Sequence, residues 1–125
     1  MEEKLIERLK DLGYEYSADA DASLLSFCKE LADNRIKNRI NHTVIPSELE
    51  QIEIDMICGE FLHLKKSTGQ LTSYQLEQVV QSIKEGDTQV SFLGGSTPEQ
   101  QFDSMVDSMM NGSNEDLIRF RRLVW

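Results

Sequence analysis

Apolar residues recur at spacings of three and four along most of this chain, which is the period of an amphipathic helix. We expect helices over 2–12, 21–40, 46–66, 74–84 and 97–111, with a short further helix from residue 114. Flanking residues agree with these bounds, because Gly13 is suited to a helix C-cap and Thr97 to an N-cap. The spacing therefore predicts an all-α fold, a small bundle of four to five helices.

The expected helix at 46–66 is the most apolar, because apolar side chains cover more than half of its circumference. Such a helix is buried centrally or shared with a neighbour. Gly59 lies inside it, where glycine destabilises a helix by about 1 kcal/mol relative to alanine, so we expect another helix to approach closely there.

The helix at 21–40 has a start that Asp19 or Asp21 can cap. Its spacing predicts an inward face that packs against the rest of the bundle. We expect this face to consist of Leu24, Leu25, Phe27, Cys28, Leu31, Ile36 and Ile40.

The pattern changes in the segment SIKEGDTQVSFLGG, residues 82–95, where apolar residues flank Ser91 at a spacing of two. This is the period of a strand. The preceding stretch, 74–84, fits either a helix or an extended arm, and we favour a short helix that leads into the arm. A solitary strand needs hydrogen-bond partners from another chain, so we predict one extended strand-like arm at about 83–93 that pairs between copies.

The length of 125 residues suits a single domain with one modest core. We expect it to comprise a helical core (1–66), a loop and arm (67–96), and C-terminal helices with a short tail (97–125). No apolar run reaches the roughly 20 residues that a membrane helix needs. The N-terminal EEKL is too acidic and polar for a signal peptide, so we expect use or assembly in a cytoplasm.

The net charge of −9 argues against a protein that coats nucleic acid, because binding phosphates requires a basic surface. From Ser67 to Ile118 the only basic residue is Lys84, whereas the last seven residues contain three arginines. An acidic body with a basic, aromatic end suits head-to-tail association of like subunits or binding to an acidic partner. The alternative is a solvated helix end where cations are favoured by the helix dipole.

Motifs for catalysis and metal binding are scarce, since the chain has no GxSxG, P-loop, GxGxxG or HExxH sequence. Glu60 and His63 have the Glu-x-x-His spacing of di-iron bundles, but a second such pair is missing. We interpret them as a polar helix edge, with a small carboxylate enzyme as the weakest alternative. Cys28 and Cys58 lack metal-ligand spacing and are expected to be buried, reduced thiols. We therefore predict no enzyme, no cofactor and no metal.

Four segments carry a resemblance to a known family. In chain order they are IPSELEQIEIDMICGEFLHLKK, SIKEGDTQVSF, TPEQQFDSMVDSMMNG and DLIRFRRLVW. In this order and spacing, from about Pro46 to Trp125, the chain resembles the small head-tail connector proteins of tailed bacteriophages, also called head-completion or adaptor proteins. The two N-terminal helices match more loosely. IKEGDTQVSF and the Arg-Arg-Leu-aromatic end are the most specific parts.

The resemblance implies an oligomeric ring of helical subunits beneath the portal vertex of a filled capsid, matched to the twelvefold symmetry of the portal. A tail or stopper protein would attach below, and DNA would pass through the channel without being read. It implies a virion protein of the head-tail interface, assembled in the host cytoplasm and able to stay monomeric when free.

Roles for individual residues also follow from the resemblance. Subunit-interface or channel contacts are assigned to Ile83, Lys84, Glu85, Gly86, Asp87, Val90, Ser91 and Phe92. Portal binding is assigned to Arg119, Phe120, Arg121, Arg122 and Trp125. The main alternative is a cytoplasmic helical adaptor or regulator that binds an acidic protein through its basic-aromatic C-terminus.

Overall fold

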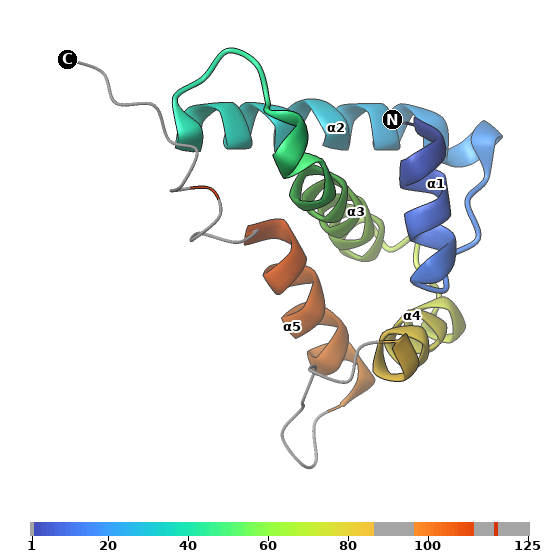
Figure 1. The fold of residues 1–125 in the computed structure, drawn as a ribbon. Coiled ribbons are helices and arrows are strands. Elements are labelled where there is room, and N and C mark those ends of the chain that lie inside the picture. Colours follow the sequence, from blue (N-terminus) through green and yellow to red (C-terminus); the bar gives the residue numbers. More distant parts are fainter. Residues whose placement is uncertain (1, 87–96, 112–116, 118–125) are drawn as a thin grey trace.

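The fold is all-α, as predicted. The computed structural model describes residues 2–86, 97–111 and 117, without the side chains of residues 83–86. The elements in this part of the chain are α1 (Glu2–Asp11), α2 (Ala18–Ile40), the 3-10 turn η1 (Ser47–Leu49), α3 (Glu50–Ser67), α4 (Ser73–Gly86) and α5 (Pro98–Asn111) (Figure 1). No strand occurs among the described residues.

Helix α3 lies at the centre of the bundle, where it packs against α1, α2 and α5 (Figure 1). Helix α4 packs against α5. The central position of α3 follows from its apolar circumference, because a helix apolar on most sides needs neighbours on most sides. Its buried apolar residues are Ile54, Met56, Ile57, Cys58, Phe61 and Leu62. The expectation of central burial is confirmed.

Gly59 marks the crossing of α3 and α5. A Cβ atom at this position would lie 2.8 Å from the Cβ of Met109 and 3.1 Å from the backbone nitrogen of Met110. Only a residue without a side chain allows the two helices to come this close. The close approach predicted from Gly59 is confirmed, and α5 is the helix that makes it.

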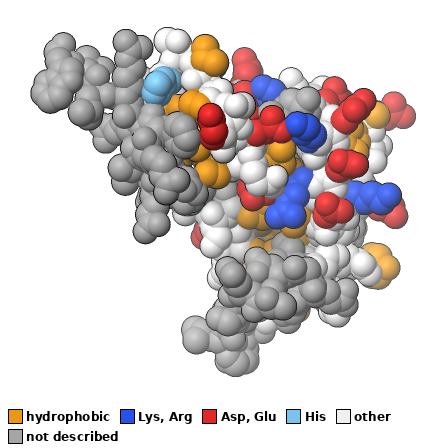
Figure 2. Space-filling model, in the orientation of Figure 1, with side chains coloured by type: hydrophobic (Ala, Val, Ile, Leu, Met, Phe, Trp, Pro, Cys, Tyr) orange, Lys and Arg blue, Asp and Glu red, His pale blue; other side chains and the backbone are white. Residues whose placement is uncertain are grey.

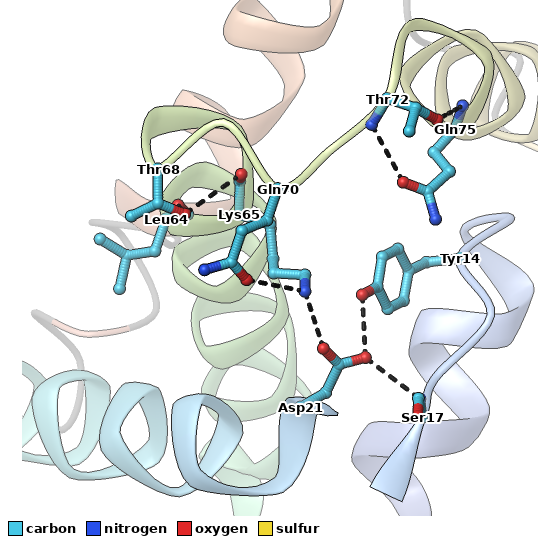
Figure 3. Close-up of polar contacts among 9 residues, drawn as sticks. All are labelled: Tyr14, Ser17, Asp21, Leu64, Lys65, Thr68, Gln70, Thr72 and Gln75. Atoms are coloured by element: carbon cyan, nitrogen blue, oxygen red, sulfur yellow. Dashed lines mark hydrogen bonds and ion pairs between the residues drawn. The ribbon is translucent and has the colours of Figure 1, made fainter. Parts of the chain in front are cut away.

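The start of α5 is stabilised by a capping box, in which two residues exchange hydrogen bonds. The Thr97 hydroxyl accepts a hydrogen bond from the Gln100 backbone N–H at 3.2 Å, and the Gln100 side chain accepts one from the Thr97 N–H at 3.0 Å. Thr72 and Gln75 form the same arrangement before α4, at 3.1 and 3.0 Å (Figure 3). The predicted N-cap at Thr97 is confirmed.

The end of α1 and the start of α2 are joined by a tight connection. Gly13 has a φ of 87°, in the left-handed region, and the Tyr14 N–H bonds the Leu9 carbonyl at 2.9 Å. Gly13 thus ends α1 as predicted. Helix α2 begins at Ala18, which is earlier than the predicted start. Asp21 lies inside the first turn, where its carboxylate accepts a hydrogen bond from the Ser17 N–H and stabilises the earlier start.

Helix α4 continues to Gly86, which corrects the predicted start of the arm. The helical alternative for residues 74–84 is therefore the right one, and Ile83, Lys84, Glu85 and Gly86 are helical rather than extended. The physical reason is the spacing of Leu76, Val79 and Val80, whose burial on one side of the helix stabilises it. The rest of the predicted arm, residues 87–93, lies outside the described residues.

Phe27 is half exposed, at 50%, so its prediction as an inward residue is wrong. Helix α2 has apolar residues on two sides, and the spacing alone does not say which side faces the core. The buried side consists of Leu25, Cys28, Ala32, Ile36 and Ile40. Leu24 and Leu31 are half-buried, and Leu24 packs against the core, so Phe27 is the member of the predicted face that lies at the surface. Among the helices that the structure describes, none has the length and apolar character required to span a bilayer.

Candidate functional site

The predicted arm is a connection between two packed helices. Its first four residues, 83–86, form the last turn of α4, and residues 87–96 join α4 to Thr97 at the start of α5. Because α4 and α5 pack against each other, both ends of this connection are anchored on the helical body. The predicted arm residues outside the described part are Asp87, Val90, Ser91 and Phe92.

The predicted tail follows a residue that is packed in the core. Leu117 is buried and belongs to the hydrophobic cluster formed by the helices. Just before it, the Arg39 side chain at the end of α2 donates a hydrogen bond to the Asn111 carbonyl at the end of α5, at 2.5 Å. The portal-binding candidates Arg119, Phe120, Arg121, Arg122 and Trp125 lie outside the described residues. The tail thus starts from a fixed point on the body.

A buried polar network, which the sequence did not reveal, ties the α1–α2 connection to the end of α3 (Figure 3). The Lys65 ammonium donates to Asp21 Oδ1 at 2.8 Å and to Gln70 Oε1 at 3.1 Å. Asp21 Oδ2 accepts from the Tyr14 hydroxyl at 2.9 Å and from the Ser17 N–H at 3.1 Å. Four segments of the chain therefore meet at one ion pair.

The network is shielded from water, since the Lys65 and Asp21 side chains are 8% and 2% exposed. Burial acts to raise the pKa of Asp21, but hydrogen bonds from Lys65, Ser17 and Tyr14 outweigh it and hold the pKa below its usual range. The pKa of Tyr14 is raised by burial and by its bond to the Asp21 carboxylate. The Asp21 carboxylate is therefore ionised, and it accepts hydrogen bonds from the Lys65 ammonium and from a neutral Tyr14 phenol.

Aromatic rings line the same network. The Tyr14 and Phe61 rings pack edge to face with centroids 5.3 Å apart, and the Lys65 nitrogen lies 6.0 Å from each centroid. This geometry allows a weak cation–π attraction. The polar groups of the network are satisfied by one another, and the network is shielded from water. It therefore stabilises the fold and does not form a binding site.

A second cluster of charged groups lies between α2 and α3. On α2, the Lys29 ammonium donates to Asp33 Oδ2 at 2.6 Å, whereas Asp33 Oδ1 is buried and has no hydrogen-bonding partner in the part of the chain described. On α3, the Glu53 carboxyl is buried and has Asp33 as a neighbour. Burial, the bond to Asp33 and the charges of Asp33 and Glu50 raise the pKa of Glu53 to about 7, although Lys29 acts in the opposite direction.

Glu60 and His63 turn to different neighbours. The Glu60 carboxylate is buried and accepts from Arg35 of α2 at 3.0 Å. His63 instead lines an open hollow between α3 and α5, together with Lys66, Ser67, Asp103 and Asp107. Within the described ranges, no three His, Cys, Asp or Glu side chains are grouped closely enough to hold a metal ion. Glu60 thus contacts α2, whereas His63 lies at the hollow beside α5.

Both cysteines are buried and unpaired, which confirms the prediction of buried, reduced thiols. Burial raises the pKa of Cys28 and of Cys58 to about 12, with a smaller effect of nearby acidic groups. At neutral pH both are protonated thiols, which are poor nucleophiles. The Cys58 thiol donates to the Leu5 carbonyl at 3.8 Å and so contributes to the contact between α1 and α3.

The surface of the body carries both signs of charge, and Figure 2 shows acidic and basic side chains intermingled on one face. Arg8 of α1 pairs with Asp55 of α3 at 2.9 Å, and Lys4 pairs with Glu50 between the same helices. Exposed pairs of this kind contribute about 0–1 kcal/mol each. They support the packing of α1 on α3 without marking a binding site.

Comparison of the chain with protein-family models, with curated proteins and with solved structures finds no match.

Proposed function

We propose that this protein is a structural subunit of a bacteriophage virion, forming a ring adaptor between the portal vertex and the tail or stopper protein. DNA passes through the channel of the ring. The proposal is carried by the IKEGDTQVSF segment, which resembles the head-tail connectors and whose second part, TQVSF, has strand-like spacing in a chain whose described elements are all helices.

The attachment of the arm supports this function. A strand leaves backbone donors and acceptors unpaired along its edges, and an equivalent strand of a neighbouring subunit can satisfy them. Around a closed ring, each arm lies on the next subunit and no edge remains free. The anchors at Gly86 and Thr97 belong to packed helices, so the body need not unfold to let the arm pair.

The negative charge where α4 meets the arm suits a channel. Glu85 and Asp87 repel phosphate groups, so a ring that presents them to DNA lets the duplex slide rather than bind. The overall net charge of −9 acts in the same direction.

The tail supports attachment to the portal. Its three arginines, Phe120 and Trp125 are residue types that frequently anchor protein interfaces. They follow Leu117, which is held in the core, so the tail can engage a partner while the helices stay packed.

The decisive experiment mixes the purified chain with portal protein and measures complex formation by sedimentation and electron microscopy. We expect rings on the portal from the full chain and none from a variant lacking Arg119 to Trp125. This truncation retains the buried Leu117, so its helical content by circular dichroism should equal that of the full chain. A truncated protein that docks normally would refute the role of the tail.

Two further variants separate the contributions of positive charge and of the terminal tryptophan to portal binding. R119A/R121A/R122A removes its positive charge, whereas W125A removes its terminal indole. If the first variant fails to dock, and if high salt also prevents the full chain from docking, the tail contacts an acidic portal surface. Loss only in W125A indicates an apolar pocket instead.

The contrast between acidic body and basic tail also favours a second function, an adaptor or regulator that binds one acidic protein. The two functions differ in stoichiometry. A ring gives a complex with many copies of this chain on the portal, whereas an adaptor gives one copy per partner and no assembly with portal protein. Light scattering of the mixture distinguishes them.

A further inference from the structure

Two acidic side chains, Asp33 and Glu53, lie between α2 and α3. Their arrangement is unfavourable if both carboxyl groups are ionised. Asp33 Oδ1 is buried and lacks a hydrogen-bond donor among the described residues, although Asp33 Oδ2 is bonded to Lys29. Glu53 is 7% exposed, and Asp33 is its hydrogen-bonding and negatively charged neighbour. Two ionised carboxylates would both be acceptors, and their charges would repel each other.

We propose that Glu53 and Asp33 share one proton, which makes the α2–α3 contact a pH-sensitive device that is strongest in mildly acidic solution and weakens as the pH rises to neutral. The Glu53 carboxyl donates this proton to Asp33 Oδ1 and thereby satisfies the buried oxygen. When the proton leaves to solvent, two like charges face each other in a shielded position.

The surrounding charges decide which carboxyl holds the proton. Asp33 is the ionised partner, because the Lys29 ammonium is bonded to it at 2.6 Å. No ion pair joins Glu53 to a cation in the described part of the chain. Glu50, on its own helix, adds a further negative charge, whereas the charge of Lys29 acts in the opposite direction. The proton therefore belongs on Glu53, in agreement with its raised pKa of about 7.

The sign of the pH effect follows from these protonation states. The unfolded chain releases the Glu53 proton near the usual glutamate value, whereas the folded chain keeps it up to about pH 7. Between these values the folded state binds more protons than the unfolded state, so stability falls as pH rises. Above pH 7 both states are ionised and the loss is complete.

The test compares urea unfolding of the full chain and of Glu53→Gln between pH 5 and pH 8. Glutamine stays neutral and its amide can donate to Asp33 at every pH. The unfolding equilibrium constant of the natural chain should rise relative to that of E53Q by on the order of 100-fold over this range. Both proteins carry the same two histidines, so the comparison cancels their contribution.

Glu60→Gln is the matched control, because Glu60 is also a buried glutamate of α3 that faces α2, but it is paired with Arg35. E60Q should lower stability and keep the pH profile of the natural chain. Parallel profiles for E53Q and the natural chain would overturn the proposal.

A direct measurement keeps the proposal testable even if E53Q fails to fold. Carbon-13 NMR of the glutamate side-chain carboxyls in the natural chain should show one signal that titrates near pH 7. The assignment follows from its absence in E53Q or, if that variant is unfolded, from its through-space contact with Asp33. Titration of Glu53 near the usual glutamate value would overturn the proposal.

Discussion

At the residue scale, this protein depends on a few buried charged side chains whose partners are remote in sequence. Lys65 and Asp21 are separated by 44 positions, and each alone suggests an ordinary solvated residue. Lys65 sits in the last turn of α3, where cations are common, and Asp21 in the first turn of α2, where carboxylates are common. The sequence therefore indicates that Lys65 and Asp21 lie near helix ends, but it does not predict the ion pair that joins them.

Replacement of Lys65 by methionine tests this pair. K65M keeps the length of the side chain but leaves the Asp21 carboxylate buried without its cation, so we expect a loss of about 3–5 kcal/mol in the free energy of unfolding at pH 7. Urea denaturation measures it. The control is Lys66→Met, which removes the more exposed pair with Asp103 and should lower stability by under about 1 kcal/mol.

The ion pair also has a predicted pH dependence. Because the folded pKa of Asp21 is lowered, its contribution is present above the usual aspartate value and is lost as pH falls through the folded pKa. The difference between K65M and the natural chain should therefore shrink in strongly acidic solution. A K65M protein as stable as K66M at pH 7 would contradict the stabilising role of the buried Lys65–Asp21 pair.

At the element scale, spacing and caps locate the helices, whereas tertiary contacts set their lengths and orientations. Thr97 and Gly13 act locally, so their roles can be predicted from the sequence. The length of α4 and the exposure of Phe27 depend on which neighbouring helix covers which side, and spacing does not contain that information. Gly59 is an intermediate case, because it predicts a close approach without naming α5.

Gly59→Ala tests whether the α3–α5 crossing is as close as the structure indicates. Alanine favours the helix by about 1 kcal/mol over glycine, so a relaxed contact would make G59A stabilising. At 2.8 Å from the Met109 Cβ, however, the added methyl group forces the two helices apart, and we expect a net loss of about 1–3 kcal/mol. Thermal unfolding measures whether G59A is more or less stable than the natural chain.

A matched control exists at Gly69, where an added Cβ would meet no atom within 4 Å but φ is 74°. G69A should be destabilised by backbone strain of about 1 kcal/mol, with no change in the contact between α3 and α5. A stabilised G59A would show that α5 can move away from α3 at little expense.

At the scale of the whole molecule, a helical body with its own core carries the attachment points of the two segments that the proposed function assigns to assembly. The hydrophobic core draws on each of the five α-helices and on Leu117, so the body has an interior without help from another chain. The arm and the tail attach to this body at Gly86, Thr97 and Leu117. In the proposed function, folding and assembly are thereby separated along the chain, so that a free subunit can be stable before it meets the portal.

Val90→Asp tests this separation between folding and assembly. In the proposed arm, Val90 contributes apolar contact with a neighbouring subunit, and a carboxylate there would be desolvated without a partner. V90D should keep the helical content and the unfolding midpoint of the natural chain but form no closed rings on the portal, as judged by electron microscopy. Gln89→Asp is the control, because alternation along a strand directs Gln89 to the face opposite Val90 and no contact is assigned to Gln89. If both variants close rings normally, the arm is a surface loop; if V90D unfolds, the arm is part of the core.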